Sequence, residues 1–217
     1  LMTYLQLVQS VLRRLREDDT IESVSDNSYS KLIGEFVNDA KRIVEDSWDW
    51  ASLRTTFTIE TTDTVFSYQL TNSDISLKTL DIINDTSNCF LKPVTSHWMN
   101  NAFLNNTPAY GSPVYYSWNG FNDAGELILD LYPIPDKEYV IRVNAVDKKA
   151  TLAEDTATLY VPSNPVIHYA VALASRERGE TGGTSSAELF AIADQTLGDM
   201  IAFDVARQPE ETVWRPV

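Results

Sequence analysis

The chain has 217 residues, of which 43% are hydrophobic and 11% are aromatic. This composition excludes a disordered chain, and the length allows one large domain or two small ones with a buried core. The net charge is -14, and acidic residues outnumber basic ones in each of the segments 1–51, 52–160 and 161–217. Tight DNA binding needs clustered Lys and Arg, so a protein that grips DNA is excluded, whereas one that lets DNA pass is not.

Signals for membrane insertion and secretion are not found in the sequence. Every apolar run is shorter than the roughly 18 residues that span a bilayer, and no basic segment precedes an apolar block near residue 1. We therefore expect no membrane span and no signal peptide. Cys89 is the single cysteine, which excludes an internal disulfide and suits folding in a reducing cytoplasm.

Two helices are predicted before residue 52. Residues 3–16 have apolar residues at helical spacing, and Thr3 and Gln6 have the spacing of a capping box. The second, longer helix starts near Asp26 or Ser28, either of which can cap it. Its apolar stripe consists of Tyr29, Leu32, Ile33, Phe36, Val37, Ala40, Ile43 and Val44.

The period of the apolar residues then changes. Trp48 and Trp50 are two residues apart, so they cannot share a helix face but can share a strand face, and the chain is predicted to enter a sheet directly. Up to about residue 160 the period is mostly two, with turn residues between strands, which is typical of an antiparallel sandwich or barrel. A short helix is predicted at 96–104 and a hairpin loop at 119–125. The predicted strands are 54–62, 64–70, 77–84, 89–94, 113–119, 126–132 and 138–146.

The helical period returns near Pro162. A third helix is predicted from Pro165 to about Arg178, where Gly179 stops it. The fourth helix begins after residue 186 and has one apolar face, which consists of Leu189, Phe190, Ala193, Leu197, Ile201 and Val205.

These elements predict an α+β fold in which one domain interrupts another. Helices from both chain ends can cover one another's apolar stripes, which favours a four-helix domain of residues 1–52 and 161–207. Residues 53–160 would form an antiparallel β-sandwich or barrel-like insertion domain. Residues 208–217 contain two prolines and no period, so they are predicted to form an extended C-terminal tail.

The sequence indicates no active site. His97 and His168 lack the spacing of metal ligands, and Cys89 has no signature of a nucleophile. The Gly-rich loop 179–186 lacks the lysine of a phosphate-binding loop and follows a helix, so we interpret it as a helix connection. The run 17–19 of three acidic residues follows arginines and is interpreted as a solvated helix end rather than a functional patch. We therefore expect no catalytic residue, no metal, no cofactor and no enzymatic activity.

Aromatic residues are the remaining candidates for recognition. One group surrounds a predicted hairpin and would suit core packing, a sugar site or a subunit interface. Its members are Tyr110, Tyr115, Tyr116, Trp118 and Phe121. In the tail, Trp214 is either disordered or an anchor for a partner's pocket. With Arg215, Pro216 and Val217 it offers an apolar surface, a forked cation and a chain stiffened by proline, so these four residues are the candidate partner interface.

Three stretches resemble a known protein family. They are 40–54 (AKRIVEDSWDWASLR), 131–136 (LYPIPD) and 174–183 (ASRERGETGG), and together they resemble the head-to-tail adaptor of short-tailed bacteriophages, the tail tubular protein A type. The resemblance implies a structural virion protein, made in the host cytoplasm, that forms a dodecameric ring at the head-tail junction. Its partners would be the portal protein, the tail nozzle protein and further copies of itself. DNA would pass through the ring during ejection without specific binding.

Two other functions stay open from the residues alone. The β-domain with its tyrosines, together with the abundant carboxylates, would suit a carbohydrate-binding or carbohydrate-cleaving module, which predicts a saturable glycan titration. The third possibility is a generic scaffold that pairs with another virion protein. An acidic adaptor ring differs from the carbohydrate module in that it would repel the phosphates of passing DNA and assemble with partners rather than bind sugars.

Overall fold

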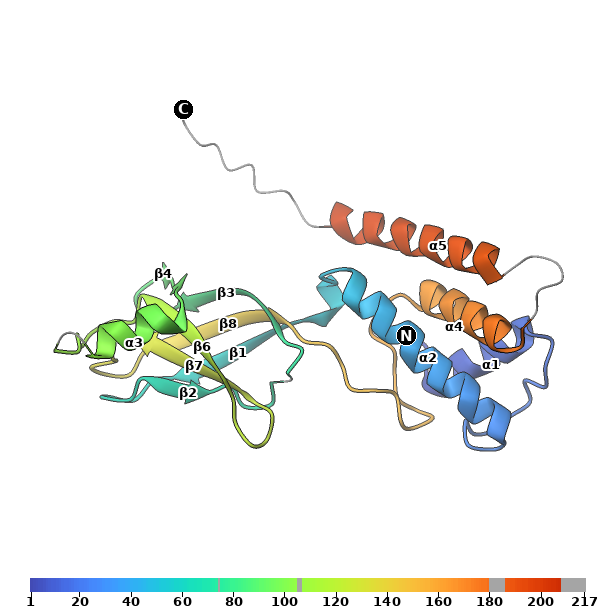
Figure 1. Ribbon diagram of the computed structural model, residues 1–217, viewed down its shortest axis with the longest axis horizontal. Coiled ribbons are helices and arrows are strands. Elements are labelled where there is room, and N and C mark those ends of the chain that lie inside the picture. The colour runs from blue at the N-terminus through green and yellow to red at the C-terminus, as the bar shows by residue number, and fades with distance from the viewer. Residues whose placement is uncertain (74, 105–106, 180–185, 208–217) are drawn as a thin grey trace, which may run out of the picture. The chain divides into compact units, whose positions relative to one another are not determined.

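The computed structural model describes residues 1–73, 75–104, 107–179 and 186–207 (Figure 1). In these ranges the fold is α+β, with five α-helices and two sheets. The chain divides into two compact units, which we describe separately. The helical unit combines Leu1–Ser52 with the described residues from Lys149 onward, and the β unit is Leu53–Lys148.

The helical unit contains α1 (Tyr4–Arg14), α2 (Ser28–Ser47), α4 (Ser163–Glu177) and α5 (Ser186–Ala206). The predicted capping box begins α1, because the Thr3 hydroxyl accepts from the Gln6 backbone N–H and the Gln6 side chain accepts from the Thr3 N–H. The cap of α2 differs from the prediction, since neither Asp26 nor Ser28 provides it. Asn27 accepts the N–H of Ser30 at 2.7 Å. The Asp26 carboxylate closes the preceding turn by accepting backbone N–H groups there.

The central helix of this unit is α4, which lies against α1, α2 and α5 (Figure 1). It ends as predicted before Gly179, whose φ of 64° lies in the left-handed region that glycine tolerates.

The contact between α1 and α2 depends on another glycine. A Cβ added at Gly34 would lie 2.3 Å from the Tyr4 hydroxyl oxygen and 2.9 Å from Val24 Cγ1. A side chain at Gly34 would therefore force the side chains of Tyr4 and Val24 to move.

Residues 149–160 were predicted in the insertion, but their backbone groups find partners in the helical unit. Asn38 of α2 accepts the N–H of Leu152 at 2.8 Å and donates to its carbonyl at 3.0 Å. Lys41 of α2 donates to the carbonyl of Lys149 at 2.6 Å and forms a buried ion pair with Glu45 at 3.0 Å. These long-range hydrogen bonds hold the segment beside α2, where local sequence pattern gave no indication of it.

The two tryptophans after α2 do not enter a strand as predicted. Trp50 is 2% exposed, and its indole N–H donates to the Val44 carbonyl at 2.7 Å. Trp48 ends α2, and its indole N–H donates to Asp204 of α5 at 3.0 Å. A 3-10 helix, Ala51–Leu53, follows before the first strand begins. Both indoles therefore find their hydrogen-bond acceptors within the helical unit.

In the described part of the β unit eight strands form two sheets, with orders β1-β8-β3-β4 and β2-β7-β6-β5. The strands are β1 (Arg54–Glu60), β2 (Ser67–Gln69), β3 (Lys78–Asn84), β4 (Cys89–Phe90), β5 (Lys92–Pro93), β6 (Tyr115–Phe121), β7 (Leu127–Tyr132) and β8 (Val140–Val146). The predicted strand 89–94 is divided at the buried Leu91, because the chain passes there from one sheet to the other. The β5–β6 pair is parallel, whereas the other strand pairs are antiparallel.

Both sheets contribute to one hydrophobic core. Alternate residues of the central strands point into it, as the period of two predicts. Its members include Ile59, Ile82, Leu129, Leu131, Ile141 and Val143.

The helix α3 (Ser96–Leu104) has the predicted bounds and buries Met99. Between β6 and β7 a bulge lies between Trp118 and Phe121, and Gly120 takes a φ of 86° there, so β6 continues beyond the predicted loop start at residue 119.

Candidate interaction surface on the helical unit

The residues predicted to be chemically inert have packing contacts. In the described ranges no group of three His, Cys, Asp or Glu side chains is arranged to hold a metal. His97 of α3 is hydrogen-bonded to Asn101 Nδ2 at 3.0 Å. His168 of α4 lies 3.3 Å from Arg14 Nη1, and burial together with the Arg14 charge lowers the pKa of its imidazole. Cys89 is half-buried in β4.

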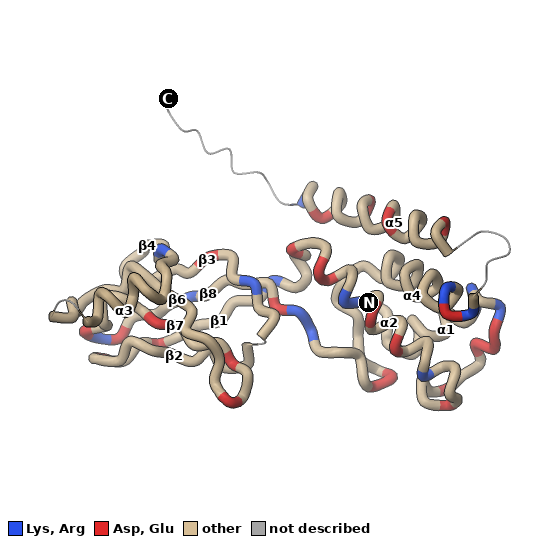
Figure 2. Tube along the Cα trace, viewed as in Figure 1, with Lys and Arg blue, Asp and Glu red and all other residues tan. Residues whose placement is uncertain are grey.

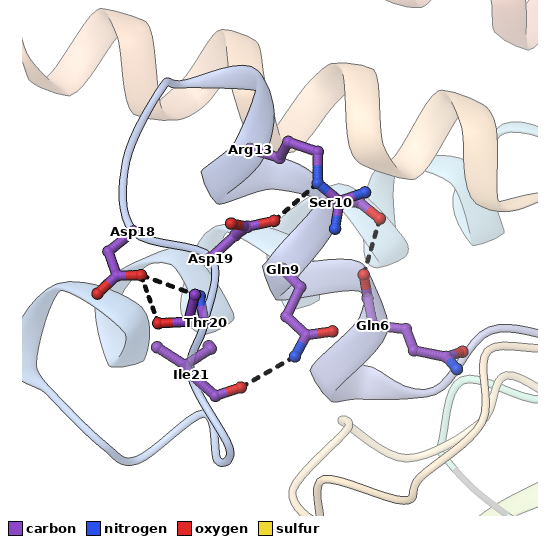
Figure 3. A network of polar contacts seen from close by, with 8 residues as sticks. All are labelled: Gln6, Gln9, Ser10, Arg13, Asp18, Asp19, Thr20 and Ile21. Atoms are coloured by element: carbon purple, nitrogen blue, oxygen red, sulfur yellow. Dashed lines mark hydrogen bonds and ion pairs between the residues drawn. The ribbon is translucent and has the colours of Figure 1, made fainter.

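The acidic residues after α1 are bound to their neighbours (Figure 3). Arg13 Nε donates to Asp19 Oδ2 at 2.7 Å, and Asp18 Oδ1 accepts the hydroxyl and the N–H of Thr20 at 2.6 and 3.0 Å. The hydrogen bonds from Thr20 lower the pKa of the Asp18 carboxyl. Such local bonds favour the interpretation of this run as a helix end and turn.

Asp130 of β7 is the buried acid with the clearest shift. It lies between Leu129 and Leu131 of the core, so its side chain points to the opposite side of the sheet. Burial raises the pKa of the Asp130 carboxyl, and hydrogen bonds from Ser67 and Asn119 oppose that rise. Its Oδ1 has no hydrogen-bond partner in the described part of the chain. Its hydrogen-bond partners are Ser67 and Asn119 rather than a histidine, so this site lacks the base and orienting group that serine catalysis needs.

The inward side of α5 rests on α4. Ala193 and Asp204 are the two buried residues among the 21 of this helix. The ring of Phe190 lies 6.4 Å from that of Tyr169, measured between centroids, and the Arg176 guanidinium lies 5.3 Å from the Phe190 centroid. The half-buried members of this side include Leu189, Phe190, Leu197, Met200 and Ile201.

Two polar contacts hold α5 in place. The Tyr169 hydroxyl of α4 donates to the Asp194 carboxylate. Near the end of α5, Asp204 Oδ2 accepts the indole N–H of Trp48 at 3.0 Å and the backbone N–H of Ala51 at 3.1 Å. Asp204 is 6% exposed, so the acceptor of these part-buried hydrogen bonds is itself shielded from water. The middle and the C-terminal end of α5 are therefore both held by the rest of the helical unit.

The outer face of α5 is apolar and uncovered. Phe203 is 64% exposed, Ile192 45% and Val205 38%. Small exposed residues accompany them, and we define the outer face as Ala187, Ala191, Ile192, Gly198, Ala202, Phe203, Val205 and Ala206. Acidic positions are spaced along this helix (Figure 2), and Glu188, Asp194 and Asp199 are exposed beside these apolar residues. Exposed apolar patches on soluble proteins commonly mark interaction sites, so this face is the candidate interaction surface.

Val205 was predicted on the inward stripe, but Asp204 takes that place because its carboxylate accepts two N–H groups there. A groove lies at this end of the helix and adjoins the outer face. Its lining includes Leu1, Trp50, Tyr160, Pro162, Met200 and Phe203. The groove is thus bordered by aromatic and aliphatic side chains.

The outer face of α5 was missed by sequence reasoning, which assigned the apolar residues of this helix to one inward stripe. The available signal was that Ile192 and Phe203 fall outside that stripe. The interface predicted in the tail, Trp214, Arg215, Pro216 and Val217, lies outside the described residues. That interface stays a prediction.

The aromatic residues around the hairpin of the β unit divide between core and surface. Tyr116 and Trp118 pack against the shared core. Tyr110 is 56% exposed and Phe121 45%. Tyr115 contacts Trp98 of α3, with ring centroids 5.0 Å apart.

The contact between Trp98 and Tyr115 is part of a larger aromatic cluster. Trp98 also lies 5.7 Å from Tyr132, and Phe103 lies 5.6 Å from Tyr132 and 4.6 Å from Phe66. Trp98 remains 40% exposed and Phe66 39%. This cluster attaches α3 to its sheet and leaves two rings partly accessible.

Comparison with known proteins identifies a matching family. A protein-family model described as SU10 adaptor protein matches residues 2–216. A search of curated proteins found no match. None of the helices in the described ranges combines the length and the apolar character needed to cross a bilayer.

Proposed function

The chain belongs to the SU10 adaptor protein family, and from this membership we propose that it is the head-to-tail adaptor of a phage, joining the portal to the tail nozzle. Membership makes it a structural phage protein that interacts with other head or tail proteins. In the proposed role it forms a dodecameric ring in the virion, surrounds part of the DNA channel and catalyses no reaction. The ring would conduct DNA during ejection.

The observation that carries this proposal is the outer face of α5. Exposed large apolar side chains commonly mark a surface that a partner covers, and Ile192, Phe203 and Val205 are open in the single chain. Burial of one Phe side chain contributes about 1.5–3 kcal/mol, so Phe203 and Ile192 together would supply a substantial part of a subunit contact. Ala187, Ala191, Gly198 and Ala202 would let a neighbouring backbone approach closely.

The charge of the chain supports a channel through which DNA passes. Attractive contacts repeated along a duplex would add up and slow its movement, whereas acidic residues repel phosphates. With a net charge of -14 per chain, a ring of such subunits would be strongly negative. We propose that DNA passes this ring without specific binding.

We further propose that the four helices fold as one cooperative domain built from both chain ends. Support comes from α4, which contacts α1 and α2 of the N-terminal part as well as α5. In this proposal residues 53–160 remain a separately folded insertion except where 149–160 joins α2. Residues 208–217 follow as a tail whose Trp214 and Arg215 bind a pocket on the portal or on a neighbouring subunit.

Assembly on the portal tests the adaptor function. Purified chain mixed with its portal protein should give a ring visible by electron microscopy, and the complex should gain the mass of the ring in light scattering. Phe203→Asp should weaken that assembly, because it places a charge in the proposed subunit contact. Phe121→Asp is the matched control, since Phe121 is also exposed but lies in the β unit. Full assembly by the Phe203 variant would remove α5 from the contact.

The second candidate is a carbohydrate-binding module, favoured by the partly exposed rings of Trp98 and Phe66. Aromatic rings of this kind can stack on sugars. A saturable glycan titration of the purified chain, lost in Trp98→Ala, would support this function. The adaptor proposal expects no such titration.

A further inference from the structure

The β unit leaves one long strand edge open. Its two sheets have four edge strands, namely β1, β4, β2 and β5. Three of these are short, with two residues in β4, three in β2 and two in β5, and β5 also contains Pro93. Short edges and proline protect sheets from pairing with other chains. β1 has seven residues and pairs with β8 without a bulge, so it lacks these protections.

The register of β1 shows which backbone groups point to the open edge. Asp147 N–H donates to the Leu53 carbonyl at 3.0 Å just before the strand, and Thr61 N–H donates to the Tyr139 carbonyl at 2.9 Å just after it. Hydrogen-bonded pairs recur at every second residue of an antiparallel ladder, so the odd-numbered residues of β1 bond to β8. The N–H and C=O groups of its even-numbered residues point away from β8.

The outward backbone groups of Thr56, Thr58 and Glu60 are available for pairing. Thr56, Thr58 and Glu60 have no backbone hydrogen bond to any segment beyond the edge in the described part of the chain. The side chains of Arg54, Thr56, Thr58 and Glu60 are exposed, whereas Ile59 is buried in the core. A strand added here would therefore extend a sheet whose inner face is apolar and whose outer face is polar.

We propose that this edge binds the same edge of a second copy of the chain, with the two β1 strands antiparallel and related by a two-fold axis at Phe57. In this register Thr56 lies opposite Thr58 of the second copy, and Arg54 lies opposite Glu60. All four are even-numbered, so their outward N–H and C=O groups form hydrogen-bonded pairs. The two ion pairs between Arg54 and Glu60 make the contact self-complementary.

Charge selects this orientation over the alternative. A parallel pairing of two β1 strands in register would place Arg54 beside Arg54 and Glu60 beside Glu60, and like charges on adjacent strands are destabilising. The antiparallel arrangement puts opposite charges at both ends. The two Thr56–Thr58 pairs, and the two Phe57 rings, which share one sheet face, complete the contact.

This pairing goes beyond the proposed adaptor function. A two-fold contact uses the same patch on both copies and closes on itself, so it cannot propagate around a ring. The pairing is proposed for the chain before it assembles into a ring, and α5 takes no part in it. Failure of the β1 pairing would leave the ring proposal intact, because ring formation is measured with the portal present and β1 pairing is measured without it.

The test is the mass of the purified full chain without portal, measured by light scattering and sedimentation over a wide concentration range. The wild-type chain should show a dimer fraction that rises with concentration. Arg54→Glu places four acidic side chains at the contact and should weaken dimerisation about tenfold or more. The double variant Arg54→Glu with Glu60→Arg reverses the polarity of both ion pairs and should recover the wild-type affinity to within about threefold.

A backbone variant gives an independent check. Thr58→Pro removes an N–H that points to the open edge, so it should abolish dimerisation while the ladder with β8 persists. Thr58→Val is its matched control and should dimerise like the wild type. Unchanged thermal melting of each variant shows that the fold is retained. A wild-type chain that is monomeric throughout, a double variant as weak as Arg54→Glu, or a dimer dissolved by Phe203→Asp would each overturn the proposal.

Discussion

Two neighbouring helices with similar apolar composition have opposite environments. Nine of the fifteen residues of α4 are buried, whereas two of the twenty-one residues of α5 are. α4 is surrounded because α1, α2 and α5 each lie against it. α5 lies against α4 with one side and presents Ile192 and Phe203 on the other.

The difference indicates that residues of α4 stabilise the folded chain, whereas residues on the outer face of α5 are available for contact with another subunit. Apolar residues of α4 stabilise the single chain, since water is already excluded from them. Apolar residues on the outer face of α5 keep part of their surface in water in the single chain and can contribute more when a partner covers them. Substitutions in the two helices should therefore affect different measurements.

The largest expected effect comes from a matched pair of Ala→Asp substitutions. Ala170 of α4 is completely buried, so Ala170→Asp places an unpaired charge in the core and should destabilise the helical unit by about 4 kcal/mol or more. Ala202 of α5 is exposed, and Ala202→Asp should change the free energy of unfolding by about 0.5 kcal/mol or less. Denaturant unfolding followed by circular dichroism measures both. Equal stability of the two variants would mean that the burial of α4 is wrong.

The next effect concerns the attachment of α5. Asp204→Ala removes the acceptor of two part-buried N–H groups, at Trp48 and Ala51, and should cost about 1–2 kcal/mol. Tryptophan fluorescence should shift as the Trp48 indole loses its partner. Asp199→Ala on the exposed side is the matched control and should leave both the fluorescence and the unfolding curve unchanged. An Asp204→Ala variant with unchanged fluorescence and an unchanged unfolding curve would show that this contact does not hold α5.

A pH dependence follows from the contact between Tyr169 and Asp194. Burial, together with the hydrogen bond to Asp194, raises the pKa of the Tyr169 phenol above its ordinary value near about 10. The folded state therefore keeps a proton that the unfolded chain loses. The stability from this group is fully present below about pH 10 and declines by about 1 kcal/mol per pH unit above it.

Tyr169→Phe should reduce that alkaline loss while costing about 1 kcal/mol at neutral pH for the missing hydrogen bond. Part of the dependence should persist, because burial also raises the pKa values of Tyr4 and Tyr29 in the same unit. Thermal melting between pH 8 and about pH 11 measures the difference. An identical alkaline slope in the variant and the wild type would exclude Tyr169 as a contributor.

The smallest expected effect comes from the glycine of α5. Nothing lies within 4 Å of a Cβ added at Gly198, so Gly198→Ala should stabilise the helix by about 0.5–1 kcal/mol. The same change at Gly34 should destabilise, because its Cβ would collide with Tyr4. If a neighbouring subunit approaches Gly198 closely, the alanine variant should melt later but assemble less well on the portal. Unimpaired assembly would place the closest approach elsewhere on the outer face.

Local sequence determined the type of most elements. The Thr3–Gln6 spacing, the period of α2 and the stop at Gly179 each depend on residues within a few positions, so a single segment contains the information. The helix 96–104 and the central strands were predicted for the same reason. The pattern also located the apolar side of α5 that contacts α4.

Tertiary structure decided which surfaces are covered. Trp48 and Trp50 have strand spacing, but their indoles bond to Asp204 and Val44, and the strand begins later. The division of 89–94 between two sheets depends on which distant strands accept its backbone groups. The open outer face of α5 and the open edge of β1 have the same origin. Local sequence pattern specifies the type of secondary structure that a segment can form. Whether one of its faces is buried depends on contacts with segments far away in sequence, and the periodicity of the segment contains no information about those contacts.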